Sequence, residues 1–337
     1  MAGTLHGFGL GVASKNAKGD VLDVFYPAPL ANISGDLVSI FDGVSGELKA
    51  TEIRALSDGL RSAGEHALAD IAVRLGEADQ PVVASLLADN AAPQTVADAY
   101  LKLHLLSHRL IKPHGTDLTG MFALLPNVAW TDEGAIDLAE LADRQLTSRL
   151  KGRVLEVASV DKFPKMTNYV VPSGVRIAHT ARVRLGAYLG SGTTVMHEGF
   201  INFNAGTDGP GMIEGRISAG VMVGKGSDLG GGCSTMGTLS GGGNIIISVG
   251  ESCLLGANAG LGIPLGDRCT VEAGLFVTAG TKVTVLDDAR EAVETLAARH
   301  LSGQSDLLFR RNSQSGSVEC LTNQTAIELN ESLHDNN

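Results

Sequence analysis

Branched apolar residues recur every six positions through much of the second half of this 337-residue chain. The pattern runs in four frames, which hold Ile177, Val183, Leu189, Val195, Ile201 and then Ile213; Ile217, Val223 and Leu229; Val249, Leu255 and Leu261; and Leu265, Val271, Val277 and Val283. A six-residue apolar period fits neither an α-helix nor an alternating strand. It is typical of a β-helix, in which each hexapeptide forms one short face and directs its apolar residue toward the axis. Three faces close one triangular turn, so residues eighteen apart should stack at the strand spacing of about 4.8 Å.

Two interruptions of this period mark positions where loops are expected to leave the coil. The first lies at residues 202–210. The second lies between Leu229 and Val249 and contains the glycine triplets 230–232 and 241–243. Glycine suits tight corners because it reaches positive φ without strain. Loops on a regular scaffold are common binding sites, so both interruptions are candidates for ligand binding.

The remainder of the chain predicts two further regions around the coil. Residues 1–165 are interpreted as an α/β domain, 166–286 as the parallel β-helix and 287–337 as a small C-terminal extension. In the N-terminal region, periodicity predicts strands at Leu5–Val12, Val21–Tyr26 and Leu37–Phe41, and a strand or short helix at Pro81–Leu87. Periodicity and capping residues predict helices there at Thr51–Leu60, Glu65–Leu75, Ile136–Leu150 and from Thr95 to Leu110. After the coil, a further helix is predicted at Ala289–Leu301 and a hairpin of Leu307–Arg311 with Ser317–Leu321. The N-terminal region shows no catalytic motif, so the coil is the place to look for chemistry.

Composition argues against several classes of function. The net charge is −11 and the pI is about 5.3, whereas proteins that bind nucleic acid usually carry a basic patch. No eighteen apolar residues run together, and no basic segment precedes an apolar run at the N-terminus, so neither a membrane span nor a signal peptide is expected. The four cysteines show no paired metal-ligand spacing, which favours apolar filling in a reduced, cytoplasmic protein.

Two histidine pairs have spacings that deserve a structural interpretation. His104 and His108 lie four apart on one predicted helix, a spacing that can chelate a metal, but no acid lies between them as in a zinc protease helix. A packed helix face is therefore favoured. His179 and His197 lie eighteen apart, one full coil turn, and should stack on one face of the coil.

Several long segments resemble the tetrahydrodipicolinate N-succinyltransferases, in the longer variety found in actinobacteria and pseudomonads. They are HEGFINFNAG (197–206), MIEGRISAG (212–220), residues 230–243, GANAG (256–260) and FRRNS (309–313), with further similarity at Ala99–Pro113 and Leu124–Thr131. The resemblance therefore covers nearly the whole chain. It implies a mainly β fold, a left-handed parallel β-helix with an α/β N-terminal domain, which is an exception to the rule of right-handed crossovers. It also implies a homotrimer with ligand grooves between neighbouring coils.

The resemblance implies transfer of a succinyl group from succinyl-CoA to the amine of tetrahydrodipicolinate, in lysine and diaminopimelate biosynthesis. Because the thioester is already activated, such an enzyme must align two substrates, remove a proton from the amine and stabilise an oxyanion. Glu214 corresponds to the catalytic residue of the family, which is described as forming an acyl anhydride. A general-base role is an equal alternative. Without the motif, Glu214 would be interpreted as a solvated glutamate at a coil corner.

The resemblance also implies a set of CoA-contacting positions. They are Arg216, Gly231, Ser234, Ala257, Glu272, Ala273, Gly280, Arg310, Arg311, Asn312 and Ser313. Small side chains would let the pantetheine arm lie against the backbone, and paired arginines suit phosphate oxygens. One departure concerns a CoA-contacting lysine that many relatives carry in the C-terminal helix, where this chain has Ala297.

Glu198 corresponds to a carboxylate that binds Mg²⁺ on the trimer axis in some relatives. Its acidic partner in those relatives is replaced here by Ala181, so a required metal is not supported. The histidine pair of the coil is also similar to the zinc site of the γ-class carbonic anhydrases, but that site needs three histidines and the coil has no third. The alternatives to succinyl transfer are a CoA-dependent transferase of the same scaffold with an acetyl donor and a non-catalytic trimeric β-helix.

Overall fold

The computed structural model describes residues 4–237 and 245–322, which form two compact units that divide after Val170. The elements of the first unit are β1 (Leu5–Lys15), β2 (Val21–Phe25), β3 (Leu30–Ile33), α1 (Asp36–Phe41), β4 (Gly46–Glu47), α2 (Ala50–Ser62), α3 (His66–Leu75), β5 (Val82–Leu87), α4 (Val96–Ser107), α5 (Met121–Leu124), β6 (Val128–Thr131), β7 (Gly134–Asp137), α6 (Leu138–Leu150) and β8 (Val157–Asp161). No helix within the two described ranges has the length and apolarity that crossing a membrane requires.

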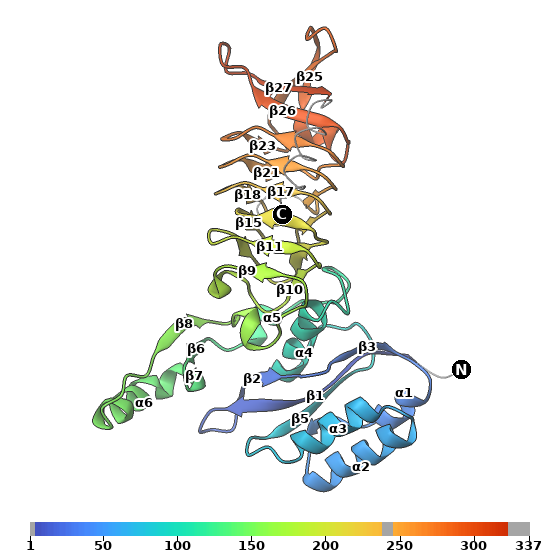
Figure 1. Ribbon diagram of the computed structural model, residues 1–337, viewed down its shortest axis with the longest axis vertical. Coiled ribbons are helices and arrows are strands. Elements are labelled where there is room, and N and C mark those ends of the chain that lie inside the picture. Colours follow the sequence, from blue (N-terminus) through green and yellow to red (C-terminus); the bar gives the residue numbers. More distant parts are fainter. Residues whose placement is uncertain (1–3, 238–244, 323–337) are drawn as a thin grey trace. The chain divides into compact units, whose positions relative to one another are not determined.

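The first unit is built on a sheet that is covered by helices on both faces (Figure 1). Strand β1 alternates glycine with larger apolar residues. Phe8 and Leu10 face the core formed with α2 and α3. The intervening glycines face α4, and a Cβ on Gly9 would lie 2.8 Å from Leu101 of that helix. The glycines therefore let α4 pack closely against the second face, as the alternation of a strand allows.

Helix α4 shows why its two histidines are structural. Thr95 caps the helix by accepting a hydrogen bond from the backbone of Asp98. His104 is fully buried, and its Nε2 accepts from the backbone N–H of Tyr26 at 3.2 Å. Its Nδ1 therefore carries the proton and donates to the Tyr100 carbonyl at 2.8 Å. The rings of His104 and His108 lie 5.9 Å apart, as neighbours on one helix face.

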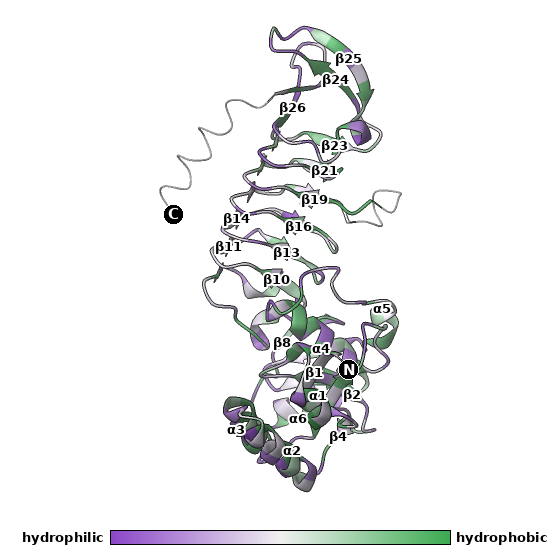
Figure 2. Cartoon of the chain, turned by 90° about the vertical axis from the view of Figure 1, so that its right-hand side faces the viewer, coloured by the Kyte–Doolittle hydropathy of each residue, from purple (hydrophilic) through white to green (hydrophobic). Residues whose placement is uncertain are grey.

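The second unit is the predicted parallel β-helix (Figure 2). Its strands are β9 (Arg176–Ile177), β10 (Ala187–Leu189), β11 (Thr193–Val195), β12 (Phe200–Ile201), β13 (Ala205–Thr207), β14 (Gly211–Ile213), β15 (Arg216–Ile217), β16 (Met222–Val223), β17 (Asp228–Leu229), β18 (Ser234–Thr235), β19 (Ser248–Val249), β20 (Leu254–Leu255), β21 (Gly260–Gly262), β22 (Thr270–Val271) and β23 (Phe276–Thr278). The apolar residues of the six-residue period are buried along its axis, as their spacing predicts, except Ile177 in the first strand, which is half-buried.

The interruption predicted at residues 202–210 is wrong. Strand β13 occupies this stretch, and Thr207 takes the inward position between Ile201 and Ile213. Its hydroxyl lies 2.6 Å from that of Thr193, which itself donates to the Gly190 carbonyl. A threonine has almost the shape of valine, and its hydroxyl is satisfied inside the coil, so the coil continues. At the start of the second predicted interruption, Thr235 takes the inward position in the same way, and its hydroxyl donates to the Arg216 carbonyl at 3.0 Å. The glycine triplet 241–243 of that interruption lies outside the described residues.

Two other predicted elements differ in the structure. Residues 37–41 belong to α1 rather than to a strand. The helix predicted at Ala289–Leu301 is instead β25 (Ala292–Ala297), followed by a short 3₁₀ turn. Strand β25 pairs antiparallel with β24 (Lys282–Leu286), so the ladder with β24 overrides the helical pattern of the sequence. Ala297 faces Lys282 across this ladder.

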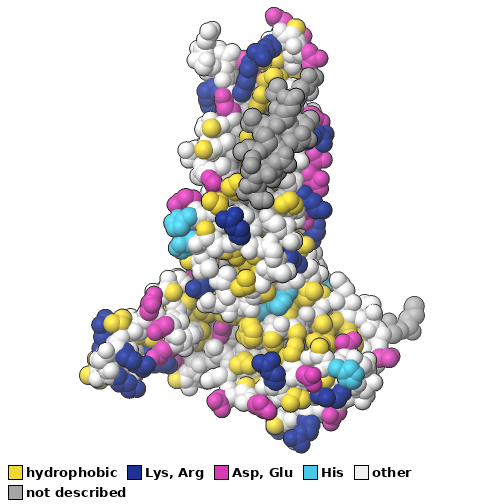
Figure 3. Space-filling model, in the orientation of Figure 1, with side chains coloured by type: hydrophobic (Ala, Val, Ile, Leu, Met, Phe, Trp, Pro, Cys, Tyr) yellow, Lys and Arg dark blue, Asp and Glu magenta, His cyan; other side chains and the backbone are white. Residues whose placement is uncertain are grey.

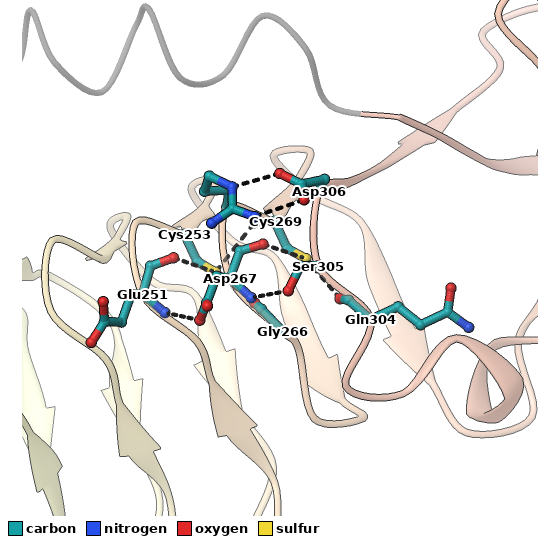
Figure 4. Close-up of polar contacts among 9 residues, drawn as sticks. Glu251, Cys253, Gly266, Asp267, Cys269, Gln304, Ser305 and Asp306 are labelled. Carbon is teal, nitrogen blue, oxygen red and sulfur yellow. Dashed lines mark hydrogen bonds and ion pairs between the residues drawn. The ribbon is translucent and has the colours of Figure 1, made fainter.

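The predicted C-terminal hairpin is present and closes the end of the coil. It consists of β26 (Leu307–Arg311) and β27 (Val318–Thr322), and β26 pairs with β22 of the last coil turn. Side chains fasten the preceding loop to the coil (Figure 4). Arg268 donates to both carboxylate oxygens of Asp306, at 2.6 and 2.7 Å, and Ser305 accepts from the backbone of Asp267.

Candidate active site

Glu214 lies on a corner of the coil that is two residues shorter than the corners on either side. Val195 pairs with Ile213 and Phe200 pairs with Arg216, so residues 196–199 of one turn face only Glu214 and Gly215 in the next. The following turn again has four residues, 230–233, between the partners of Ile213 and Arg216. The corner of Glu214 is therefore recessed between two longer corners.

Glycines at and next to the short corner make this recess possible. A Cβ on Gly215 would lie 2.2 Å from Cys233 Sγ and 2.7 Å from the Cys233 carbonyl oxygen. A Cβ on Gly199 would lie 2.3 Å from the Ile213 carbonyl oxygen. All three distances are far below ordinary van der Waals contact, so at neither position does another residue type fit without movement of the neighbouring atoms.

The Glu214 side chain is half-buried and extends toward the next turn. Its Oε2 is 3.4 Å from the position that a Cβ on Gly231 would take. The surface above the carboxylate is therefore bare backbone, which leaves room for a ligand. On the corner of the following turn, burial and then the Glu214 charge raise the pKa of the Cys233 thiol to about 12. Cys233 is accordingly a neutral packing group rather than a nucleophile.

Arg216 begins the strand that follows the short corner, on the outward face of β12 and β15. Its guanidinium carbon lies 5.7 Å from the centre of the Phe200 ring. Arg184 approaches the same ring at 5.8 Å and donates to Asn202 Oδ1 at 3.1 Å. Arg216 has no acidic partner among residues 4–237 and 245–322. A cation held on an aromatic ring two residues from Glu214 is available to an anionic ligand.

The remaining predicted CoA positions fall largely along the same edge of the coil. In successive coil turns, the inward residues of one face pair with one another, and one residue follows each of them at the corner. These corner residues are therefore spaced at about 4.8 Å along the axis, and they are Glu214, Gly230, Gly256, Glu272 and Arg310. Gly231, Ala257 and Ala273 come next on the same corners. Ser234 pairs with Arg216 on the adjoining face, whereas Gly280 lies beyond β23 and away from this edge. Backbone and side chains that are neither apolar nor charged, drawn in white, cover much of the visible coil surface (Figure 3).

The cluster at 310–313 lies at the upper end of this edge, but three of its side chains already have partners within the chain. Arg310 binds the Glu319 carboxylate at 2.9 Å, and Asn312 donates to the same carboxylate at 2.7 Å. Glu272 accepts from the backbone N–H of Arg311 at 2.6 Å. These contacts order the hairpin against the coil. Arg311 and Ser313 are exposed, and the Arg311 guanidinium donates to the Gly316 carbonyl at 3.1 Å.

The histidines of the coil stack as their spacing predicts. The rings of His179 and His197 lie 5.3 Å apart at nearly a right angle. Glu198 interacts with two neighbours, His197 Nδ1 at 3.2 Å and Arg182 at 3.5 Å. No group of three or more potential metal-ligating side chains occurs within the described part of the chain. One carboxylate beside a guanidinium does not fit a divalent cation, so no chemical step is derived through a metal here.

Sequence reasoning missed the supporting residues of the site, although a signal for them exists. Gly199 and Cys233 lie on the longer corners to either side of the short corner, and Phe200 supports Arg216. The spacing of four rather than six between Ile213 and Ile217 is the mark of the shortened turn in the sequence.

Comparisons with known proteins are consistent along the whole chain. The family profile described as "Tetrahydrodipicolinate N-succinyltransferase middle" matches residues 125–165, and that described as "Hexapeptide repeat of succinyl-transferase" matches 246–279. The chain is 63% identical to the 2,3,4,5-tetrahydropyridine-2,6-dicarboxylate N-succinyltransferases of Pseudomonas paraeruginosa and Pseudomonas putida, over 100% of each chain. It is 57% identical to the Vibrio cholerae enzyme of that name, over 98% of both chains.

A solved structure shows the same fold. A Campylobacter jejuni protein assigned as a 2,3,4,5-tetrahydropyridine-2-carboxylate N-succinyltransferase superposes with a TM-score of 0.86 at 33% identity. The match covers 96% of this chain and 93% of the other.

Proposed function

The chain belongs to the tetrahydrodipicolinate N-succinyltransferase family, and on that premise we propose that it transfers the succinyl group of succinyl-CoA to the amine of tetrahydrodipicolinate. The products are N-succinyl-2-amino-6-oxopimelate and CoA, and the reaction serves lysine and diaminopimelate biosynthesis. The observation that carries the proposal is the recessed corner, which holds one carboxylate, Glu214, beside bare backbone and a cation, Arg216.

Glu214 is proposed as the general base. The amine nitrogen attacks the thioester carbonyl carbon, its proton passes to the Glu214 carboxylate, and the C–S bond breaks as the CoA thiolate leaves and takes up a proton. In the alternative, the Glu214 carboxylate attacks the thioester first and releases CoA before the acceptor arrives, forming a mixed anhydride. Rapid mixing with succinyl-CoA alone separates these routes, because the anhydride route gives a burst of about one thiol per site and the base route gives none.

The CoA molecule is proposed to follow the edge of the coil above Glu214. The small residues at Gly231, Ser234, Ala257 and Ala273 would let the pantetheine arm lie against backbone. At the upper end, Arg311 and Ser313 offer exposed donors to the phosphates, whereas Arg310 and Asn312 would act by holding the hairpin. The Glu272 carboxylate positions Arg311 by accepting from the backbone N–H of Arg311. Gly280 stays a predicted CoA contact and lies away from this edge.

Assembly and location are proposed from the family rather than from the single chain. The homotrimer is proposed from the family resemblance. The cytoplasmic location is consistent with CoA as co-substrate and with four cysteines that are all buried and unpaired. Glu198 stays the position at which the family resemblance predicts Mg²⁺, and the Arg182 guanidinium 3.5 Å from its carboxylate opposes such a cation.

Thiol release from succinyl-CoA, measured with and without tetrahydrodipicolinate and beside acetyl-CoA, tests the proposed function. Release that depends on the acceptor and occurs with succinyl-CoA alone supports it. Release with acetyl-CoA alone would keep the coil and the CoA edge but change the donor. No release with either thioester, together with no CoA binding in calorimetry, would favour the non-catalytic scaffold.

A further inference from the structure

A groove of about 850 Å³ crosses the coil face formed by β9, β11 and β14, and of its lining residues only Met212 belongs to a segment that carried the family resemblance. Its lining includes Arg176, Thr194, Met196, Met212, Lys225 and Glu251. None of the predicted CoA positions is among the lining residues. The groove is therefore a separate feature of the coil surface.

The groove adjoins the short corner of Glu214. Met212 precedes Glu214 by two residues on β14, and the inward Ile213 stands between them, so both side chains leave the coil on its outer side. Met196 occupies the matching corner position one turn earlier, where its N–H donates to the Ile213 carbonyl at 2.9 Å. Two groove residues thus adjoin the turn that carries the carboxylate.

The donor positions follow the strands of this coil face, whereas the groove covers the face itself and the corner that precedes the strands. Gly231 and Ala257 come after β17 and β20, whereas the groove residues Lys225 and Glu251 come before the same two strands. The other groove residues Arg176, Thr194 and Met196 belong to turns that precede Glu214. An acyl transfer needs the two substrates to meet at one carboxylate from different directions. The arrangement gives each substrate its own approach.

The charges of the groove suit an anionic molecule with an apolar middle. Arg176 and Lys225 are exposed, and neither has an acidic partner within the parts of the chain described. Between them the wall is formed by Met196, Met212 and the small face of Thr194. Glu251 is the acid among the lining residues, and its negative charge partly opposes the two cations.

We propose that this groove binds the acceptor, as a dicarboxylate whose carboxylates are held by Arg176 and Lys225 while its amine reaches Glu214. The inference rests on the proposed function and deepens it by giving the acceptor a site. Guanidinium and ammonium groups bind carboxylates through charge-assisted hydrogen bonds, and the two methionines supply a surface that adapts to the carbon chain. Arg176 and Lys225 are specificity-determining residues in this account, because they bind the acceptor without touching the donor.

Steady-state kinetics of Arg176→Gln and Lys225→Gln tests the proposal. Each change removes one charge-assisted contact, so KM for the acceptor should rise about tenfold or more. KM for succinyl-CoA and kcat should stay within about twofold of the parent enzyme. Arg299→Gln is the matched control, because Arg299 is an exposed arginine of the same unit outside the groove. Glu251→Gln should leave KM for the acceptor unchanged or lower it.

Heptanedioate, a dicarboxylate of the same chain length without the amine, provides a readout that needs no turnover. It should compete with the acceptor rather than with succinyl-CoA, and calorimetry should show weaker binding to both groove variants than to the parent and to Arg299→Gln. An unchanged acceptor KM in both variants, or a rise in KM for succinyl-CoA instead, overturns the groove assignment while leaving the activity intact. If the parent enzyme releases no thiol, the proposed function fails, and heptanedioate binding still decides whether the groove takes a dicarboxylate.

Discussion

Gly215→Ala is the sharpest perturbation of the short corner. The new Cβ would lie 2.2 Å from Cys233 Sγ and 2.7 Å from the Cys233 carbonyl oxygen, so these atoms must retreat by about 1 Å to reach ordinary contact. That carbonyl accepts the ladder hydrogen bond from the Arg216 N–H at 2.8 Å. Overpacking costs about 1–3 kcal/mol and a weakened hydrogen bond adds about 1 kcal/mol, so the unfolding free energy should fall by about 2–4 kcal/mol.

Activity should fall more steeply than stability in this variant. A displacement of about 1 Å at a catalytic group can cost about a hundredfold in rate, and Glu214 is the immediate neighbour of the new methyl group. The assay is kcat for acceptor-dependent thiol release, measured below the melting temperature of the variant and beside urea unfolding of the same preparation.

Two further variants show whether the contact with Cys233 is the cause. Gly237→Ala is the control, because its Cβ would meet the nearest atoms at 3.4 and 3.5 Å and its φ is not positive. It should retain both stability and turnover. Adding Cys233→Ala to Gly215→Ala removes the 2.2 Å contact with sulfur but not the 2.7 Å contact with oxygen, so part of the lost stability should return. A Gly215→Ala enzyme that melts and turns over like the parent would refute the reasoning.

Two other predictions concern buried polar groups. Thr193→Val should lower the urea midpoint, because it leaves the buried Thr207 hydroxyl without its partner at a cost of about 1–3 kcal/mol. The double variant Thr193→Val with Thr207→Val should lose less stability than the single variant. A double variant that is less stable than the single one would contradict the pairing. Burial lowers the pKa of His104 in the folded state to about 3, so protonation of His104 favours the unfolded state. The free energy of unfolding should therefore be highest above pH 6.5, and it should fall by up to about 1.4 kcal/mol per pH unit below that value. Urea unfolding of the first unit between pH 7 and pH 5 measures this slope, which should be shallower in His104→Gln and would count against the account if it were unchanged.

The coil could be predicted from the sequence because its constraint is local and repeated. Each inward residue needs only to be apolar and of the right size, so a period of six is enough to place Ile177, Val195 and Ile213 on one stack. Thr207 escaped this rule because an apolar count treats threonine as polar. Inside the coil its hydroxyl is satisfied by Thr193, and what remains is a side chain shaped like valine.

The C-terminal extension could not be predicted in the same way, because its structure depends on pairing rather than on local pattern. Residues 289–301 contain helix-forming alanine and leucine, yet the stretch 292–297 forms a ladder with β24. Leu307–Arg311 was easier to place, because the turn residues Ser315 and Gly316 separate it from a second strand.

For the candidate site, long motifs pointed to Glu214 and Arg216, but the geometry that makes the corner special is a matter of register. Only the pairing of Val195 with Ile213 and of Phe200 with Arg216 reveals that two residues stand where neighbouring turns have four. The groove depends on the same register, since Arg176 and Lys225 are separated by 49 positions in the sequence and come to one surface only when the coil turns are stacked.

The central claim is that the Glu214 carboxylate at the recessed corner carries out the transfer, and its most direct test is product formation by Glu214→Gln. The assay measures succinylated acceptor by mass spectrometry after incubation with saturating succinyl-CoA and tetrahydrodipicolinate. Glutamine keeps the size of the side chain and removes the charge, so the coil should remain folded while kcat falls by at least about a hundredfold, which is the contribution expected of a general base. Near-normal product formation by a folded Glu214→Gln enzyme would contradict the account.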